Sequence, residues 1–423
     1  MTKERIGFIS TRFSGTDGVS LEAAKWAKVM EEDGHDIFWY AGRINRPKEI
    51  SMCVPEAHFE HPEITWINKR IWGSTKRSKF VTDRIRNLSY YLKDTLHQFI
   101  EKYDITLIVL ENAVTIPMNL PLGVALAEFL LEIDIPAIAH HHDFYWERSR
   151  FSVNAVNDYL EMAFPPKDPE LYHTVINKNA ADDLAWRKGC SSTLVPNVID
   201  FKEDDPNIHV DAAEMKRELG FEEDDIIFLQ PTRVVPRKGI EHAIQLISML
   251  GNDKIKLCIS HDSGDEGYDY ESMLREMAAR ENVDMRFVNA RVSEERKTSP
   301  TGEKIYSLWD VYAIADLVTY TSLYEGFGNA FLEAIYHRKP LLVNRYDIFM
   351  RDIEPKGFQT ITIDGYVTNY TVNQVQKLLD DKELQKKMTD TNYDLGKKYY
   401  SYEVLRHKLR LVLSSIRGEV YHD

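Results

Sequence analysis

Residues 320–334 read Tyr320-Thr321-Ser322-Leu323-Tyr324-Glu325-Gly326-Phe327-Gly328-Asn329-Ala330-Phe331-Leu332-Glu333-Ala334. The apolar run 317–320 predicts a buried strand, and the residues from Ala330 onward predict a helix, so two glycines fall in the turn between them. Glycine allows positive φ and a close approach of the backbone to another molecule, and a helix N-terminus offers N–H groups to an anion. The stretch therefore predicts an α/β fold with an anion-binding turn.

Two carboxylates frame this turn. Glu325 precedes the glycines, and Glu333 follows about one turn into the predicted helix. Their spacing suits two groups of hydroxyls on either side of a bound phosphate. Glu333 alone is explained equally well as an acid near a helix N-terminus, where negative charge is favourable.

The segment Glu-Gly-Phe-Gly is followed by a second Glu, with seven residues between the two acids. This pattern resembles the donor-binding signature of the retaining nucleotide-sugar glycosyltransferases of family 4, which have the two-domain GT-B fold. The resemblance implies that Glu325 holds the hydroxyls of the donor sugar, Glu333 the ribose, and the turn the diphosphate. The donor-binding residues of this stretch are then Glu325, Gly326, Phe327, Gly328, Asn329, Ala330 and Glu333.

The composition excludes several classes of protein. The chain has 423 residues, enough for two domains, and a net charge of -14, which argues against a general binder of nucleic acid or anionic membranes. Its three cysteines form no disulfide framework or zinc motif, so a reduced cytoplasmic setting is expected. No uncharged apolar run is long enough to predict a membrane span.

The N-terminal region predicts a Rossmann-like domain. A strand at 6–10, a glycine loop and a helix open it, but Gly15 and Gly18 do not form the dinucleotide fingerprint, so a dehydrogenase is disfavoured. The resemblance implies that this loop lies under the donor diphosphate and beside the acceptor, with Gly15 and Gly18 contacting the donor and Asp17 the acceptor. An ordinary tight turn is the alternative.

Three consecutive histidines follow directly after a predicted strand at 135–139. Neighbouring side chains of a strand point to opposite faces, so His140, His141 and His142 cannot easily share an ion, and no metal site is expected. The resemblance implies one histidine beside the donor sugar, either His141 or His142, and a neighbouring acceptor contact at Asp143. His140 is expected to be structural.

Residues 68–86 hold seven basic side chains against one acid. In so acidic a chain, this contrast suggests a rim that attracts an anionic acceptor through Lys76 and Arg77. The alternative is a solvated helix face or loop, because most charge runs are of that kind.

A second α/β domain begins with a predicted strand at 226–230, and Arg233, four residues and then Lys238-Gly239 follow it. This spacing resembles the diphosphate clamp of the family. Fixed cations stabilise the charge that develops on a departing nucleoside diphosphate, so no cofactor is expected. The resemblance also implies that the nucleobase lies against the loop containing Arg291 and Val292.

The predicted enzyme has two Rossmann-like α/β domains facing each other across a cleft (GT-B). We expect an acceptor domain at 1–201, a nucleotide-sugar domain at 202–395 and a C-terminal helix at 396–423 that crosses back to the first domain. The expected reaction moves glucose or mannose, with retention, from a UDP- or GDP-hexose to a hydroxyl of a soluble acceptor, as in making an osmolyte of the mannosylglucosyl-phosphoglycerate type. Alternatives are an envelope glycan or lipid acceptor, or a nucleotide-sugar epimerase on the same fold.

Overall fold

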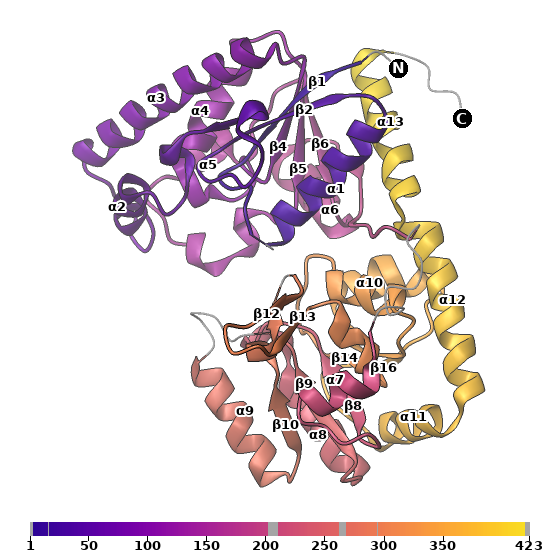
Figure 1. The fold of residues 1–423 in the computed structure, drawn as a ribbon. Coiled ribbons are helices and arrows are strands. Elements are labelled where there is room, and N and C mark those ends of the chain that lie inside the picture. Colours follow the sequence, from indigo (N-terminus) through magenta and orange to yellow (C-terminus); the bar gives the residue numbers. More distant parts are fainter. Residues whose placement is uncertain (1–2, 16, 202–209, 262–267, 294, 419–423) are drawn as a thin grey trace. The chain divides into compact units, whose positions relative to one another are not determined.

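The computed structural model describes residues 3–15, 17–201, 210–261, 268–293 and 295–418. These residues cluster into two units, one from Met1–Asn197 and Tyr402–Asp423 and the other from Val198–Ser401 (Figure 1). Residues 202–209, at the expected start of the second domain, lie outside the described residues. No helix among the described residues has the length and hydropathy needed to cross a membrane.

The first unit contains a seven-stranded parallel sheet in the order β3-β2-β1-β4-β5-β6-β7. The strand order reverses between β1 and β4, which is the Rossmann arrangement. The strands are β1 (Arg5–Ile9), β2 (Asp36–Ala41), β3 (Ser51–Cys53), β4 (Leu107–Glu111), β5 (Ala137–His141), β6 (Leu171–Val175) and β7 (Thr193–Leu194).

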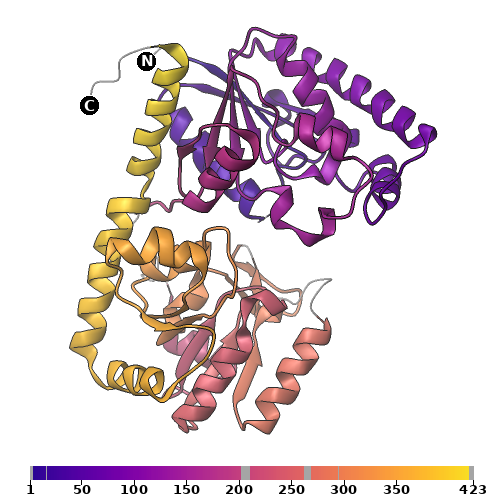
Figure 2. The ribbon, with the colours of Figure 1, turned by 180° about the vertical axis from the view of Figure 1, so that it is seen from behind.

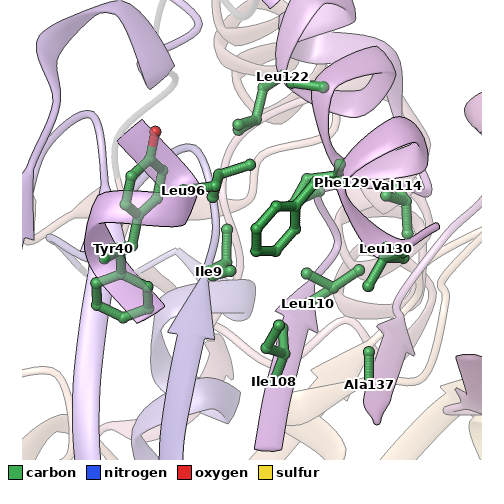
Figure 3. Packing of buried hydrophobic residues seen from close by; sticks show 14 of the residues in the cluster. Ile9, Tyr40, Leu96, Ile108, Leu110, Val114, Leu122, Phe129, Leu130 and Ala137 are labelled. Atoms are coloured by element: carbon green, nitrogen blue, oxygen red, sulfur yellow. The ribbon is translucent and has the colours of Figure 1, made fainter. Parts of the chain in front are cut away.

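Helices cover both faces of this sheet: α3, α4 and α5 lie on one side and α1, α6 and α13 on the other (Figures 1 and 2). The helices are α1 (Gly18–Glu32), α2 (Pro62–Ile71), α3 (Lys79–Tyr103), α4 (Leu120–Leu130), α5 (Asn157–Ala163), α6 (Lys178–Lys188) and α13 (Tyr402–Arg417). Leu96 of α3 and Phe129 of α4 pack with Ile108 and Leu110 of β4 in one buried cluster (Figure 3). Burial of this apolar surface holds the layers together.

The helix α13 joins the first unit through arginines. Arg406 Nε and Arg410 Nε lie 3.0 and 2.8 Å from the Asp33 carboxylate at the end of α1, and Arg417 Nη2 lies 2.6 Å from Glu4 Oε2. Residues 396–401 of the expected returning segment instead belong to the second unit, where 396–400 form the end of α12.

The second unit contains a six-stranded parallel sheet in the order β10-β9-β8-β14-β15-β16, beside a small three-stranded sheet in the order β11-β13-β12. The strands are β8 (Ile226–Gln230), β9 (Ile255–Ile259), β10 (Asp284–Phe287), β11 (Val292–Ser293), β12 (Lys297–Thr298), β13 (Lys304–Ser307), β14 (Leu317–Tyr320), β15 (Leu341–Asn344) and β16 (Ile361–Ile363). The helices are α7 (Ala212–Glu218), α8 (Ile240–Leu250), α9 (Tyr268–Arg280), α10 (Asn329–Tyr336), α11 (Asn369–Asp380) and α12 (Lys382–Tyr400). The order of the larger sheet reverses between β8 and β14, so the loops that follow these two strands lie together.

Candidate active site

The loops after β8 and β14 are bonded to each other. The Leu323 N–H donates to the Arg237 carbonyl at 2.9 Å, and the Thr321 hydroxyl donates to the Lys238 carbonyl at 3.0 Å. These backbone contacts bring the predicted cation loop against the predicted glycine turn.

A buried ion pair joins the two loops. The Lys238 ammonium contacts Glu325 Oε1, and Arg237 Nη1 lies 3.0 Å from Glu325 Oε2. The Lys238 and Glu325 side chains are only 10% and 9% exposed. The Glu325 carboxylate, the predicted ligand of the sugar hydroxyls, is engaged by two cations in this structure. Arg237 was not anticipated as a partner.

Neighbouring positive charges keep the Glu325 carboxyl ionised despite its burial. Burial alone would raise the pKa of Glu325, but the positive charges of Lys238 and Arg237 outweigh it and hold the pKa below its usual value. Burial lowers the pKa of Lys238. The positive charges of Arg237 and Arg233 lower it further, whereas the negative charge of Glu325 raises it. Arg233 is exposed and close enough to act on Lys238, so three cations share one neighbourhood.

The glycine turn has no room for a side chain at Gly328. Its φ is +122°, and a Cβ there would lie 2.7 Å from the Tyr346 hydroxyl and 2.9 Å from the Tyr320 hydroxyl. The Tyr346 hydroxyl donates to the Phe327 carbonyl at 2.7 Å, which fixes the turn. Helix α10 starts at once with Asn329 and Ala330, so the start of the helix is held in one position.

Glu333 lies on the first turns of α10 and is half-buried. The hydroxyl of the buried Tyr312 donates to Glu333 Oε2 at 2.8 Å and fixes the orientation of the carboxylate. Burial raises the pKa of Tyr312, and the Glu333 charge raises it further, so the phenol stays protonated and acts as a donor.

In the predicted nucleobase loop, Arg291 and Val292 both make contacts within the second unit. Arg291 Nη2 lies 3.1 Å from Glu218 Oε2, and Arg291 Nε donates to the Lys304 carbonyl at 3.0 Å. Val292 belongs to β11 and pairs with Tyr306 of β13. The Arg291 side chain therefore ties α7 to the small sheet.

The loop after β1 in the first unit caps a helix. Asp17 is the N-cap of α1: its carboxylate accepts from the Ser20 N–H at 3.2 Å and from the Ser20 hydroxyl at 2.7 Å. Arg12 Nη2 lies 3.0 Å from the same carboxylate. Gly15 has φ +79°, and Gly18 is the first residue of α1 rather than a loop residue. The capping contacts give Asp17 a structural role at the start of α1.

The histidines after β5 divide between two environments. His141 is fully buried, with Nδ1 2.5 Å from the Thr115 hydroxyl and Nε2 2.9 Å from His173 Nδ1. Burial holds the pKa of His141 well below its usual value, so the ring is neutral. His142 is 9% exposed, so of the two candidates His142 is the one able to face a ligand.

Glu111 at the end of β4 was missed from the sequence. Its buried carboxylate lies 3.0 Å from His140 Nδ1 and 3.4 Å from His142 Nε2. A lone glutamate after an apolar strand does not indicate a site by its local sequence, and only the pairing of β4 with β5 shows its partners.

The predicted acceptor contact Asp143 is bound by Arg148, whose Nε lies 2.5 Å from Asp143 Oδ2.

Three of the seven basic residues in 68–86 form ion pairs, namely Arg77, Lys79 and Arg84. Arg77 forms a two-point ion pair with Asp158, with Nη1–Oδ1 at 2.7 Å and Nη2–Oδ2 at 2.5 Å, and also donates to the Ala155 carbonyl at 2.6 Å. Lys76 is exposed. Arg77 therefore ties the start of α3 to α5, and its guanidinium is engaged within the first unit.

Comparison with known proteins agrees with this architecture. The profile of the glycosyl transferases group 1 family matches residues 211–394. The chain is 33% identical over 416 residues to a mannosylglucosylglycerate synthase of Petrotoga mobilis, covering 90% of this chain and 92% of that protein. It is 30% identical over 440 residues to the enzyme of the same name from Thermotoga maritima, covering 95% and 97%.

Solved structures match the fold at low identity. A glycosyltransferase from Rickettsia africae aligns with a TM-score of 0.71 at 12% identity, covering 99% of this chain and 100% of that chain. Anabaena HepE in complex with UDP and glucose aligns with a TM-score of 0.67 at 14% identity, covering 98% and 100%. The predicted GT-B class is thus confirmed, and the chain belongs to the glycosyl transferases group 1 family and is a hexosyltransferase.

Proposed function

We propose that this enzyme transfers a mannosyl group from nucleoside diphosphate mannose to glucosylglycerate, giving mannosylglucosylglycerate. The observation that carries the proposal is the identity of 33% and 30% to two mannosylglucosylglycerate synthases, each over at least 90% of this chain. A mannosylglucosyl-3-phosphoglycerate synthase of Petrotoga mobilis is less similar, at 24% over 62% of this chain and 49% of that protein. The acceptor without a phosphate is therefore favoured.

The pairing of Arg77 with Asp158 supports the same choice. A guanidinium that already holds a carboxylate at two points offers little to an acceptor phosphate. Lys76 remains as an exposed cation near the start of α3 and suits a single carboxylate at most.

The cations beside the glycine turn would bind the donor diphosphate. Arg233 offers a planar fork and Lys238 a fixed ammonium, and their charge stabilises the nucleoside diphosphate as it departs. Arg237 adds a third positive charge within contact of Glu325. Glu325 keeps Lys238 ionised and in place, and Glu333, oriented by Tyr312, is suited to ribose hydroxyls.

The chemical step joins an acceptor hydroxyl oxygen to the anomeric carbon of mannose. The bond between that carbon and the diphosphate oxygen breaks, and the departing phosphate takes the acceptor proton. Attack from the face of the departing group gives retention. Positioning with charge stabilisation would supply most of the rate.

We assign donor binding to the second unit and acceptor binding to the first, with acceptor contacts near Asp17 and Asp143. We also assign the protein to the cytoplasm. Support for the cytoplasm is that Cys53, Cys190 and Cys258 are free thiols.

A thermal-shift panel of UDP-, GDP- and ADP-hexoses tests the donor site, because a ligand that binds only the native state raises the melting temperature. One nucleoside diphosphate mannose should raise it, and Lys238→Met should abolish the rise. Lys256→Met is the matched control, since Lys256 is a half-buried lysine paired with Asp284 at 3.3 Å in the same unit.

Product analysis then tests the acceptor. Incubation with the donor and glucosylglycerate should give mannosylglucosylglycerate faster than incubation with the 3-phosphoglycerate form gives its product. A preference for the phosphorylated acceptor, or an epimerised donor without any acceptor, would overturn the proposal.

A further inference from the structure

A carboxylate and two imidazoles converge at the carboxyl end of the first sheet. Glu111 ends β4 and pairs in register with His140 of the parallel neighbour β5, and His142 follows two residues later. Side chains alternate along a strand, so His140 and His142 share one face while His141 points to the other. His141 therefore cannot join the other two histidines at one ion. His140 and His142 lie on the same face, beside Glu111.

The separations between Glu111 and each of the two histidines fit ligation of one ion. Glu111 Oε2 lies 3.0 Å from His140 Nδ1 and 3.4 Å from His142 Nε2, and the three ligand atoms all lie within 4.8 Å of one another. Two ligand atoms that are each about 2.1 Å from an ion, at bond angles of roughly 90–110°, are separated by about 3.0–3.4 Å.

The backbone holds the cluster in place. The Asn112 N–H donates to the His140 carbonyl at 3.0 Å, and the His142 N–H donates to Asn112 Oδ1 at 3.2 Å. The Trp26 ring stacks on the His140 ring with centroids 4.1 Å apart and planes 22° apart. These contacts orient the imidazoles before any ligand binds, as a metal site requires.

The charge of the cluster favours a cation. Glu111 is fully buried, and in the described part of the chain no lysine or arginine forms an ion pair with it. Glu22 of α1, only 1% exposed, is a second buried carboxylate in the first unit, and its Oε1 is paired with Lys25 Nζ at 2.5 Å. Buried carboxylates need a cationic partner, and a divalent ion between two imidazoles would supply one.

We propose that Glu111, His140 and His142 bind a divalent first-row transition-metal ion, such as Zn²⁺ or Mn²⁺. Two imidazoles and one carboxylate suit these ions better than they suit Mg²⁺ or Ca²⁺, which prefer oxygen ligands. Three protein ligands leave at least one coordination position for a water or a hydroxyl oxygen. The inference does not depend on the identity of the acceptor.

Isothermal titration calorimetry of the chelator-stripped full chain tests the inference, with ZnCl₂, MnCl₂ and CoCl₂ titrated separately and without nucleotide sugar. The wild type should bind one ion per chain, and bound Co²⁺ should show the visible absorption of nitrogen and oxygen ligation. Glu111→Gln and His142→Gln should each weaken binding about tenfold or more. His142→Gln carries the test where Glu111→Gln does not fold, since His142 lies at the rim of the cluster.

His97→Gln is the matched control, because His97 Nε2 lies 3.2 Å from Glu132 Oε2 at the surface, where Lys93 also pairs with Glu132. It should bind metal as the wild type does. Absence of stoichiometric binding by the wild type, or equal binding by folded His142→Gln, would show a hydrogen-bonded cluster only and overturn the inference. Donor-induced thermal shifts report separately on the proposed function.

Discussion

The buried pair of Lys238 and Glu325 leads to a quantitative prediction. Glu325 has two cationic partners, whereas Lys238 has one carboxylate partner. Removing the carboxylate leaves a buried ammonium without a counter-charge, which costs about 3–5 kcal/mol. Removing the lysine leaves Glu325 bonded to Arg237 at 3.0 Å, so only one charged hydrogen bond is lost, at about 1.5–3 kcal/mol.

We therefore expect Glu325→Gln to destabilise the second unit more than Lys238→Met. The double variant should cost less than the sum of the two by about 2 kcal/mol, because the second substitution removes the charge that the first left unpaired. Urea denaturation at pH 7 measures the free energies, and hydrogen exchange of peptides covering β14 and α10 assigns the transition to this unit.

Lys254→Met is the control, since Lys254 and Asp224 form an exposed pair at 2.8 Å, and its loss should leave the denaturation midpoint unchanged. Equal destabilisation by Glu325→Gln and Lys238→Met, or costs that add within about 0.5 kcal/mol, would refute this account of the pair.

Three further predictions follow from the structure. Gly328→Ala should abolish the donor-induced thermal shift, because its Cβ would lie 2.7 Å from the Tyr346 hydroxyl, whereas Gly251→Ala, with open space around it, should keep the shift. Burial lowers the pKa of His173 to about 4, so this ring stabilises the fold fully above its unfolded pKa of about 6.5 and loses that contribution as the pH falls towards 4. Thermal melts between pH 7 and pH 4 should accordingly show a smaller acid loss in His173→Asn, by up to about 3 kcal/mol, and an unchanged pH profile would contradict the assignment. Arg77→Ser should lower the melting temperature of the first unit while Lys76→Ser leaves it unchanged, and equal effects would argue against the Arg77–Asp158 tie.

The features that could be predicted from sequence are those carried by local patterns. The apolar run 317–320 forms β14, and the residues that follow the glycines form α10. Arg233 and Lys238 could be placed after a strand because apolar periodicity marks β8. Their association with the glycine turn depends on β8 lying next to β14, which matches the reversal of strand order in this class of sheet.

The partners of these residues could not be predicted in the same way. Arg237 reads as one more surface cation beside Lys238, and its contact with Glu325 joins residues from two separate loops. Glu111 meets His140 and His142 only through the pairing of two strands. The stretch 297–304 reads as a polar loop, yet it contributes β12 and the first residue of β13, because backbone pairing there does not depend on an apolar face.

The two ends of the chain meet in one folding unit, and this has a consequence for biosynthesis. The ribosome completes the entire sequence of the second unit before it releases α13, the last helix of the first unit. Until then the Asp33 carboxylate lacks its ion-pair partners Arg406 and Arg410. The first unit can therefore reach its final form only after α13 has been synthesised.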